Sequence, residues 1–206
     1  MKQTKDRNVS KTALLILSHA NSMFAEFGYD GTIMDDLAQR AGVNKASIYY
    51  HFTDKKYLYE QCLTKQFKLV VDYTIGEVER VQATKDKLNQ LIVSFAHKAD
   101  ENPQMPSILM RELANGGMNM PVNARKQLQR ILFQLQEILE RGASEDIFHP
   151  MDAFSVHIMI IGSICFFISS RPMRLAIDTP EVVDPSLDEA INGVAEIILN
   201  GLLKSK

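Results

Sequence analysis

Apolar residues recur at helical spacing from one end of the chain to the other, and this pattern limits the folds that the chain can adopt. Near the N-terminus, Leu17, Ala20, Phe24 and Phe27 stand at positions i, i+3, i+7 and i+10 and so share one face of a helix. The sequence has no convincing two-residue alternation and no hairpin turn between apolar runs. It therefore predicts an all-α fold.

Capping residues divide the first part of the chain into short helices. Ser10 is a suitable N-cap for the first helix, and Gly28 is a suitable end because glycine adopts the left-handed conformation without a Cβ clash. Thr32 is the predicted N-cap of a second, short helix, with Asp35 three residues later, close to a capping box. Gly42 closes this second helix.

A third helix follows the connection AGVN, and two short helices joined in this way form a helix-turn-helix pattern. Asn44 is its predicted N-cap, and Thr53 is the predicted cap of a fourth helix. Ile48 and Phe52, at i and i+4, turn inward. The outer surface is then left to Lys45, Ala46, Ser47, Tyr49, Tyr50 and His51. Small residues, hydrogen-bond donors and long polar tips suit a helix that enters the DNA major groove.

The charge distribution supports an anionic partner at this end of the chain. Residues 1–58 hold eight Lys or Arg against six Asp or Glu, whereas the rest of the chain holds 15 against 19. Lys55 stands in the first turn of the predicted fourth helix, where the helix dipole disfavours a cation. We therefore expect a phosphate partner for Lys55.

Longer helices are predicted beyond residue 58. Their bounds are set by prolines, glycines and capping residues, and the predicted segments are 54–81, 84–102, 105–117, 121–142, 150–170 and 187–202. Gly142 is the predicted stop of the fourth of these helices, and Ser186 with Glu189 forms a capping box for the last one. A loop that contains Pro172, Pro180 and Pro185 separates the last two.

The last two predicted helices indicate a dimer. The helix from Pro150 to Ser170 is apolar nearly all round, and the last helix has a broad apolar face. One chain of this size has too little surface to cover both, so we predict a four-helix interface with a second copy, with Ile164 as a candidate interface residue. The most apolar run, IMIIGSICFFI, is too short to span a bilayer, so no membrane partner is expected.

From about Thr12 to Leu58 the sequence resembles the TetR family of bacterial transcriptional repressors. The resemblance rests on an ordered series of residues: Phe24, Gly28, Tyr29, Thr32, Leu37, Ala38, Ala41, Gly42, Val43, Lys45, Tyr49, His51, Phe52, Lys55 and Leu58. It implies an N-terminal three-helix helix-turn-helix DNA-binding domain, residues 1–56. An all-helical ligand-binding and dimerisation domain, residues 57–206, would follow.

The resemblance also implies roles for individual residues. Thr32 and Lys55 match phosphate-contacting positions of the family, and the recognition-helix contacts match Lys45, Ala46, Ser47, Tyr49, Tyr50 and His51. Ala46 departs from a common glycine, and Lys56 departs from a common acidic residue, which would allow a further phosphate contact. Two other readings stay open: the tyrosines pack against neighbouring helices, or His51 caps the third helix.

The body of the chain suggests an adaptable apolar pocket, because most of the methionines lie there and methionine side chains repack around varied shapes. These are Met105, Met110, Met118, Met120, Met151, Met159 and Met173. The candidate ligand-binding residues are Met110, Arg111, His157, Phe166 and Arg174. The alternative is that the methionines only fill gaps in a helical core.

Catalysis, metals and cofactors are not expected. The sequence lacks the nucleophile, phosphate-loop and zinc-protease motifs, and His149, Asp152 and His157 do not form a recognised ligand set. Ser163, Cys165 and His157 share one apolar helix without an acidic partner. The two cysteines, Cys62 and Cys165, have no disulfide or metal spacing, which together with the polar N-terminus predicts a cytoplasmic protein.

The predicted function is a transcriptional repressor that binds a pseudo-palindromic operator in double-stranded DNA as a homodimer. A small hydrophobic or amphipathic effector would release it. Two alternatives stay open: a DNA-bound protein-interaction or architectural factor without a small ligand, and a small all-helical enzyme.

Overall fold

A computed structural model of the chain describes residues 10–177 and 183–204. These residues form ten helices: α1 (Lys11–Gly31), α2 (Met34–Arg40), α3 (Lys45–His51), α4 (Lys55–Glu79), α5 (Thr84–Asp100), α6 (Gln104–Ala114), α7 (Val122–Ser144), α8 (Ala153–Ser169), α9 (Arg171–Leu175) and α10 (Leu187–Leu202). The only β-type pairing in the described part is an isolated bridge between Phe148 and Leu203. The predicted all-α fold is confirmed.

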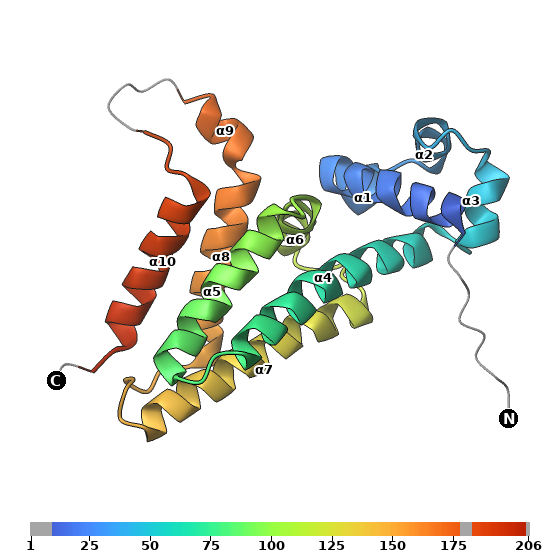
Figure 1. Cartoon of the computed structure of the whole chain (residues 1–206). Helices are drawn as coiled ribbons and strands as arrows, with labels where there is room; N and C mark the ends of the chain where they lie inside the picture. The colour runs from blue at the N-terminus through green and yellow to red at the C-terminus, as the bar shows by residue number, and fades with distance from the viewer. Residues whose placement is uncertain (1–9, 178–182, 205–206) are drawn as a thin grey trace, which may run out of the picture.

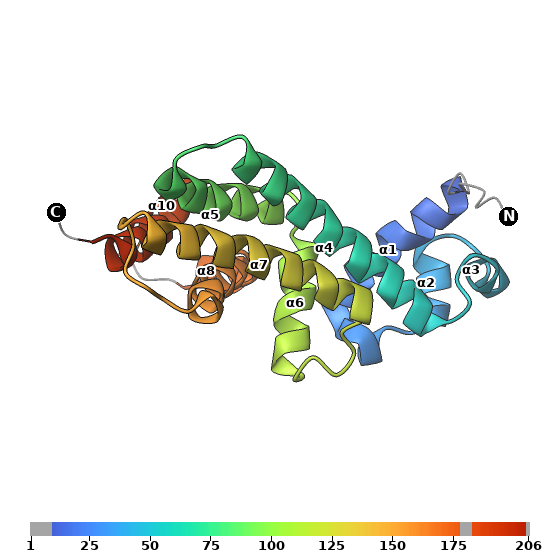
Figure 2. The same cartoon turned by 90° about the horizontal axis from the view of Figure 1, so that it is seen from below.

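The helices are distributed between two ends of the molecule (Figure 1). α1, α2 and α3 lie at one end, and α8, α9 and α10 lie at the other. α4 runs from the first group into the body beside α5 and α7, as the view from below also shows (Figure 2). α6 packs against both α1 and α8, so it bridges the two ends. Residue 56, the predicted domain boundary, falls in the first turn of α4.

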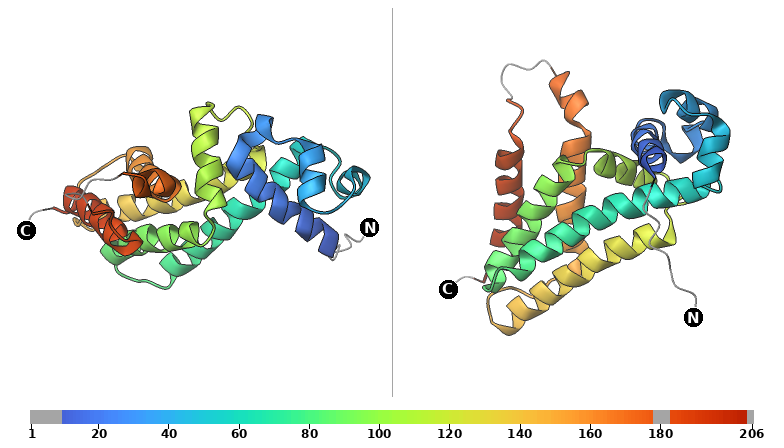
Figure 3. Two further views of the ribbon diagram at one scale, coloured as in Figure 1. Left: turned by 90° about the horizontal axis from the view of Figure 1, so that it is seen from above. Right: turned by 45° about the vertical axis from the view of Figure 1, so that its right-hand side comes forward.

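One continuous apolar core extends through both ends of the molecule. Buried side chains from α1 to α10 belong to a single cluster, and its largest fully buried members include Tyr59, Phe24, Phe67 and Phe148. α8 and α10 stand side by side at the far end (Figure 3), where much of their surface faces outward. No helix in the described part of the chain is long and apolar enough to cross a membrane.

α1 begins and breaks where the sequence predicts. The Ser10 side chain accepts a hydrogen bond from the Ala13 N–H at 3.1 Å. Gly28 leaves the helical conformation with φ 73° and ψ −177°, although a further turn carries the chain on to Gly31. Phe27, predicted on the apolar face, is instead 40% exposed and packs under the guanidinium of Arg40.

Two predicted N-caps were wrong by one residue each. Ile33, not Thr32, precedes α2, and it makes no side-chain capping bond. The Thr32 hydroxyl instead donates to the Gly28 carbonyl at 2.8 Å, at the helix break. α4 is capped by Asp54, not Thr53, because the Asp54 carboxylate accepts from the Tyr57 N–H at 2.7 Å.

Three predictions for the C-terminal half were also wrong. α7 continues past Gly142 to Ser144, so Gly142 is not a stop. α8 begins at Ala153 rather than Pro150, with Asp152 as its N-cap. A short helix, α9, occupies part of the predicted loop, because Pro172 is tolerated in the first turn of a helix. Pro180 lies outside the described residues.

The predicted capping box at the start of α10 is confirmed. The Ser186 side chain accepts from the Glu189 N–H, and the Glu189 carboxylate accepts from the Ser186 N–H.

Candidate nucleic-acid interface

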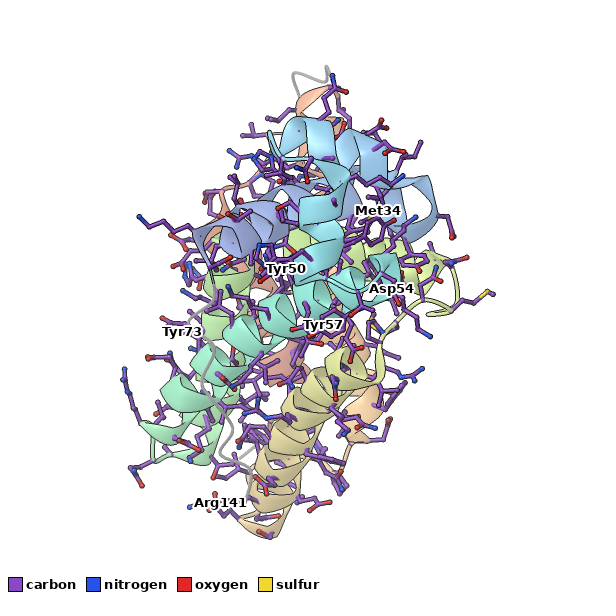
Figure 4. The ribbon with its side chains drawn as sticks, turned by 90° about the vertical axis from the view of Figure 1, so that its right-hand side faces the viewer. Met34, Tyr50, Asp54, Tyr57, Tyr73 and Arg141 are labelled. Carbon is purple, nitrogen blue, oxygen red and sulfur yellow. The ribbon has the colours of Figure 1, made fainter. Side chains whose placement is uncertain are left out.

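The recognition segment forms a short helix with one buried and one exposed face. Asn44 caps α3 by accepting from the Ser47 N–H at 2.7 Å, as predicted. Ile48 and Phe52 are buried against the other N-terminal helices. Tyr50 is 84% exposed, and Lys45, Ala46 and Tyr49 are exposed beside it. Figure 4 looks onto this end of the molecule, with Tyr50 and Asp54 labelled.

Lys45 is held by a neighbouring helix rather than lying free. Its Nζ donates to the Asp35 carboxylate of α2 at 2.9 Å, and this bond raises the pKa of Lys45. Both side chains are exposed, and exposed ion pairs contribute little to stability. Breaking this ion pair therefore costs little, and a contact of Lys45 with DNA stays a prediction.

Lys55 is the first residue of α4, and its side chain contacts the last turn of α1. Its Nζ donates to the Asp30 carbonyl at 3.3 Å and stands 4.7 Å from the centre of the Tyr29 ring. Partial burial lowers the pKa of Lys55. The ammonium group is held against the last turn of α1, and Lys56, the next residue, is exposed. Its contact with a phosphate stays a prediction.

Two other residues of the predicted interface take part in internal contacts. Thr32 is only 1% exposed, and its hydroxyl is bonded to Gly28, so its side chain lies inside the protein and not on the outer surface. His51 is half-buried, with its Nε2 3.4 Å from the Ser10 Oγ. The imidazole therefore lies where α3 ends and α1 begins.

A second candidate site lies in the body. A partly open cavity of about 430 Å³ lies between α6, α7 and α8. Its walls are mainly apolar: Leu109, Leu113, Leu128, Leu132, Phe154, Ile158, Ile161 and Gly162. The polar side chains at the cavity are Arg125, Gln129 and His157, and burial lowers the pKa of His157. Such a cavity suits a mainly apolar molecule with one or two polar groups.

The five residues predicted to bind a ligand do not come together. His157 lines the cavity between α6, α7 and α8, whereas Phe166 and Arg174 line a separate groove of about 290 Å³ between α8 and α10. Met110 lines neither space and packs against the core. The Arg111 guanidinium is bonded to α1, with Nε 2.8 Å from the Ala25 carbonyl oxygen.

Sequence reasoning missed Arg125 and Gln129. Both stand on the same face of α7 as Leu128 and Leu132, at i, i+3, i+4 and i+7, which is the signal that would have found them. No group of three or more potential metal ligands comes together in the part of the chain that the structure describes.

Two family models match the sequence. The model described as bacterial regulatory proteins, tetR family, matches residues 16–62, and the model described as tetracyclin repressor-like, C-terminal domain, matches residues 85–194. The chain belongs to the TetR family. It is therefore a DNA-binding transcriptional regulator, and the family is not one of enzymes.

Curated relatives match less than half of the chain. The negative regulator IcaR of the biofilm operon icaADBC from Staphylococcus aureus (strain Newman) is 35% identical over 86 residues, which are 42% of this chain and 46% of the relative. IcaR from Staphylococcus epidermidis is 31% identical over the same length. The match thus spans about half the length of these relatives.

Solved structures match along nearly the whole chain. PfmR from Thermus thermophilus is 25% identical, with a TM-score of 0.69 over 92% of this chain and 99% of that one. FadR from Bacillus subtilis in complex with stearoyl-CoA is 21% identical, with a TM-score of 0.72 over 91% and 98%. KstR2 from Mycobacterium tuberculosis is 20% identical, with a TM-score of 0.73 over 95% and 96%. The last two matches support the fold alone.

Proposed function

We propose that this regulator is a repressor that binds a pseudo-palindromic operator as a homodimer and is released by a small, mainly apolar effector. The observation that carries the proposal is the exposed face of α3, which presents Tyr50, Tyr49 and Lys45 on a helix whose other face is buried. Repression is supported by the similarity to IcaR, which is a negative transcriptional regulator.

The DNA contacts divide into two kinds. Lys45, Ala46, Tyr49 and Tyr50 face the base edges, because they are exposed on the outer surface of α3, and the half-buried Ser47 lies among them. Lys55 and Lys56 contact phosphates, which position the protein but carry no sequence information. His51, at the end of α3, either contacts the DNA backbone or holds α3 on α1 through Ser10.

The dimer forms through α8 and α10. Both helices expose large apolar side chains that do not line the cavity between α6, α7 and α8: Met159 and Phe166 on α8, and Ile197 on α10. Apolar surface of this kind favours a self-complementary contact with a second copy. Ile164 is only 3% exposed and packs inside its own protomer, so it is not a suitable residue for testing the contact.

The effector occupies the cavity between α6, α7 and α8. A hydrophobic or amphipathic molecule fits the apolar walls, and Arg125, Gln129 or His157 binds its polar end. The complex of FadR with stearoyl-CoA gives an example of an amphipathic ligand on the same fold. An effector releases DNA only if it binds more tightly to the conformation whose recognition helices are wrongly spaced.

A pair of titrations tests the proposal. Operator affinity is measured by fluorescence anisotropy with and without a saturating amphipath, with stearoyl-CoA and a free fatty acid as first probes. A coupling of roughly 1–3 kcal/mol lowers operator affinity by about 5- to 150-fold. Calorimetry then measures binding of the active probe with and without operator.

Reciprocity decides the outcome, because operator must weaken probe binding by the same factor. Equal probe affinity in both calorimetric titrations contradicts release by that effector. A series of amphipaths without any effect on operator affinity favours a DNA-bound interaction protein that has no small ligand.

A further inference from the structure

α6 has one face towards the cavity and another towards the DNA-binding helices. Leu109 and Leu113 of α6 line the cavity between α6, α7 and α8. The neighbouring positions, Arg111 and Glu112, make polar contacts with α1 and α4. A shift of this one helix therefore moves contacts on both sides.

Arg111 binds the backbone of α1 with two donors. Its Nε donates to the Ala25 carbonyl at 2.8 Å, and its Nη2 donates to the Glu26 carbonyl at 2.6 Å. Both carbonyls lie just before the break at Gly28, where φ is 73°. Carbonyl groups at a helix end lack helical partners, and a cation there is favoured by the helix dipole.

The contact is specific to the backbone of α1. The Glu26 carboxylate is bonded to Arg40 at 2.8 Å, so Arg111 is not paired with that side chain. A Cβ atom on Gly28 would lie 3.9 Å from the Arg111 Cδ, which shows that the arginine stem runs along the break. The planar guanidinium spans two carbonyls, a geometry that a lysine ammonium cannot reproduce.

Glu112 fixes the same end of α6 to α4. Its buried carboxylate accepts from the Tyr59 hydroxyl at 2.5 Å and from the Asn119 N–H at 3.2 Å. Burial, followed by the bond to Glu112, raises the pKa of Tyr59 well above its usual range. The Tyr59 ring in turn packs against Tyr29, with centroids 5.0 Å apart, and Tyr29 lies beneath Lys55.

We propose that Arg111 is a positioning residue that sets the orientation of α1, α2 and α3 relative to the body. Glu112 holds α6 on α4, and Arg111 ties α1 to that fixed point. The guanidinium thus determines how the recognition helices are presented relative to the body. The part concerning operator affinity rests on the proposed function.

The orientation is measured within one protomer. Gln39 on α2 and Glu137 on α7 are exposed, and both native cysteines are buried, so Gln39→Cys and Glu137→Cys provide a pair of spin-label sites. Labelled chain is diluted with unlabelled chain, and the distance distribution is measured by double electron–electron resonance. Arg111→Ala should broaden or shift this distribution. Arg111→Lys should give an intermediate width, because it keeps the charge and loses the two-carbonyl geometry.

Operator binding provides the second readout. Arg111→Ala should weaken operator binding by roughly 3- to 30-fold, within the range typical of residues that couple two sites. The salt dependence should not change, because Arg111 contacts no phosphate. The matched control is Arg80→Ala, since Arg80 is exposed and its bonded partner in the structure is Glu77 of its own helix.

Each outcome decides the inference. An unchanged distance distribution in Arg111→Ala, or an unchanged operator affinity, overturns it. If circular dichroism shows that Arg111→Ala is unfolded, Arg111→Lys decides in its place: wild-type distances and affinity in that variant overturn the inference. If the wild type binds no operator, the proposed function fails, and the distance measurement still tests whether Arg111 orients the N-terminal helices.

Discussion

The recognition helix α3 and the C-terminal helix α10 both expose large side chains, but these side chains have different chemistry. Tyr50 of α3 is 84% exposed and ends in a hydroxyl, with Lys45 nearby on the same helix. Ile197 of α10 is 75% exposed and has no polar atom in its side chain. The first surface suits a hydrated, charged partner, whereas the second gains free energy only by being covered.

This difference supports the proposal that DNA binds at one end of the molecule and a second copy of the chain at the other. The two ends share one core through α4 and α6. Substitutions can therefore be chosen to disturb one end while the other serves as the control.

The largest effect is expected from a charge on the apolar end. Ile197→Asp should break the dimer, because an unpaired charge buried in an interface costs several kcal/mol. Operator affinity should fall by about 100-fold or more, although α3 is untouched. Light scattering should then show only the 23.3 kDa protomer. Asn192→Asp, an exposed polar position of the same helix, is the matched control and should remain dimeric.

Substitution of Gly142, a glycine in the body, should lower the stability of the fold without affecting DNA contacts. A Cβ on Gly142 would lie 2.0 Å from the buried Phe148 ring, so Gly142→Ala should destabilise the fold by about 1–3 kcal/mol. Gly76→Ala is the control, because a Cβ there meets nothing within 4 Å and alanine favours a helix by roughly 0.5–1 kcal/mol. In thermal unfolding, Tm should be lower for Gly142→Ala and higher for Gly76→Ala than for the wild type. Equal Tm values would show that the Phe148 ring does not need the space beside Gly142.

A smaller effect is expected at the DNA end. Lys55→Ala should weaken binding to all DNA sequences alike, because it removes a phosphate contact. The slope of log affinity against log salt should become shallower by about 1. Lys85→Ala, an exposed lysine of α5 far from α3, should leave the slope unchanged. A wild-type slope in Lys55→Ala titrations would remove Lys55 from the interface.

The smallest effect concerns pH at the cavity. Burial lowers the pKa of His157 in the folded chain below its ordinary value of 6.5. The unfolded chain therefore binds a proton at His157 more readily than the folded chain does. The contribution of neutral His157 to the free energy of unfolding is present above pH 6.5 and is lost as the pH falls below 6.5. His157→Gln should reduce the drop in Tm between about pH 7.5 and about pH 5.5. An identical drop in both proteins would mean that His157 titrates normally.

Local chemistry made α3 and the start of α10 predictable from the sequence. Asn44 and Ser186 each bond to a backbone group three residues away, so the sequence window contains both partners. Ile48 and Phe52 are buried because helical periodicity alone places them opposite the polar face of α3. The resemblance to the TetR family supplied the DNA-binding roles, which periodicity does not reveal.

Features that depend on distant partners were not predictable in the same way. Arg111 donates a hydrogen bond to a carbonyl 86 residues earlier. A glycine is needed at position 142 because the ring of Phe148, which follows the end of α7, occupies the place of a Cβ atom. Thr32 is a good N-cap by type, but its hydroxyl bonds the Gly28 carbonyl at the break in α1. The predicted ligand residues scattered over several surfaces, because composition indicates an apolar pocket without saying which helices enclose it.

The central claim is that the α3 face reads DNA while the α8 and α10 end pairs two copies of the chain. The most direct test is to select binding sites from a random DNA pool with the full-length protein and to footprint the enriched sequence. We predict two inverted half-sites whose centres lie about 34–36 Å apart, or a multiple of that distance, and Tyr50→Ala should fail to enrich them. Enrichment of a single asymmetric site, or an equal result with Tyr50→Ala, would contradict the account.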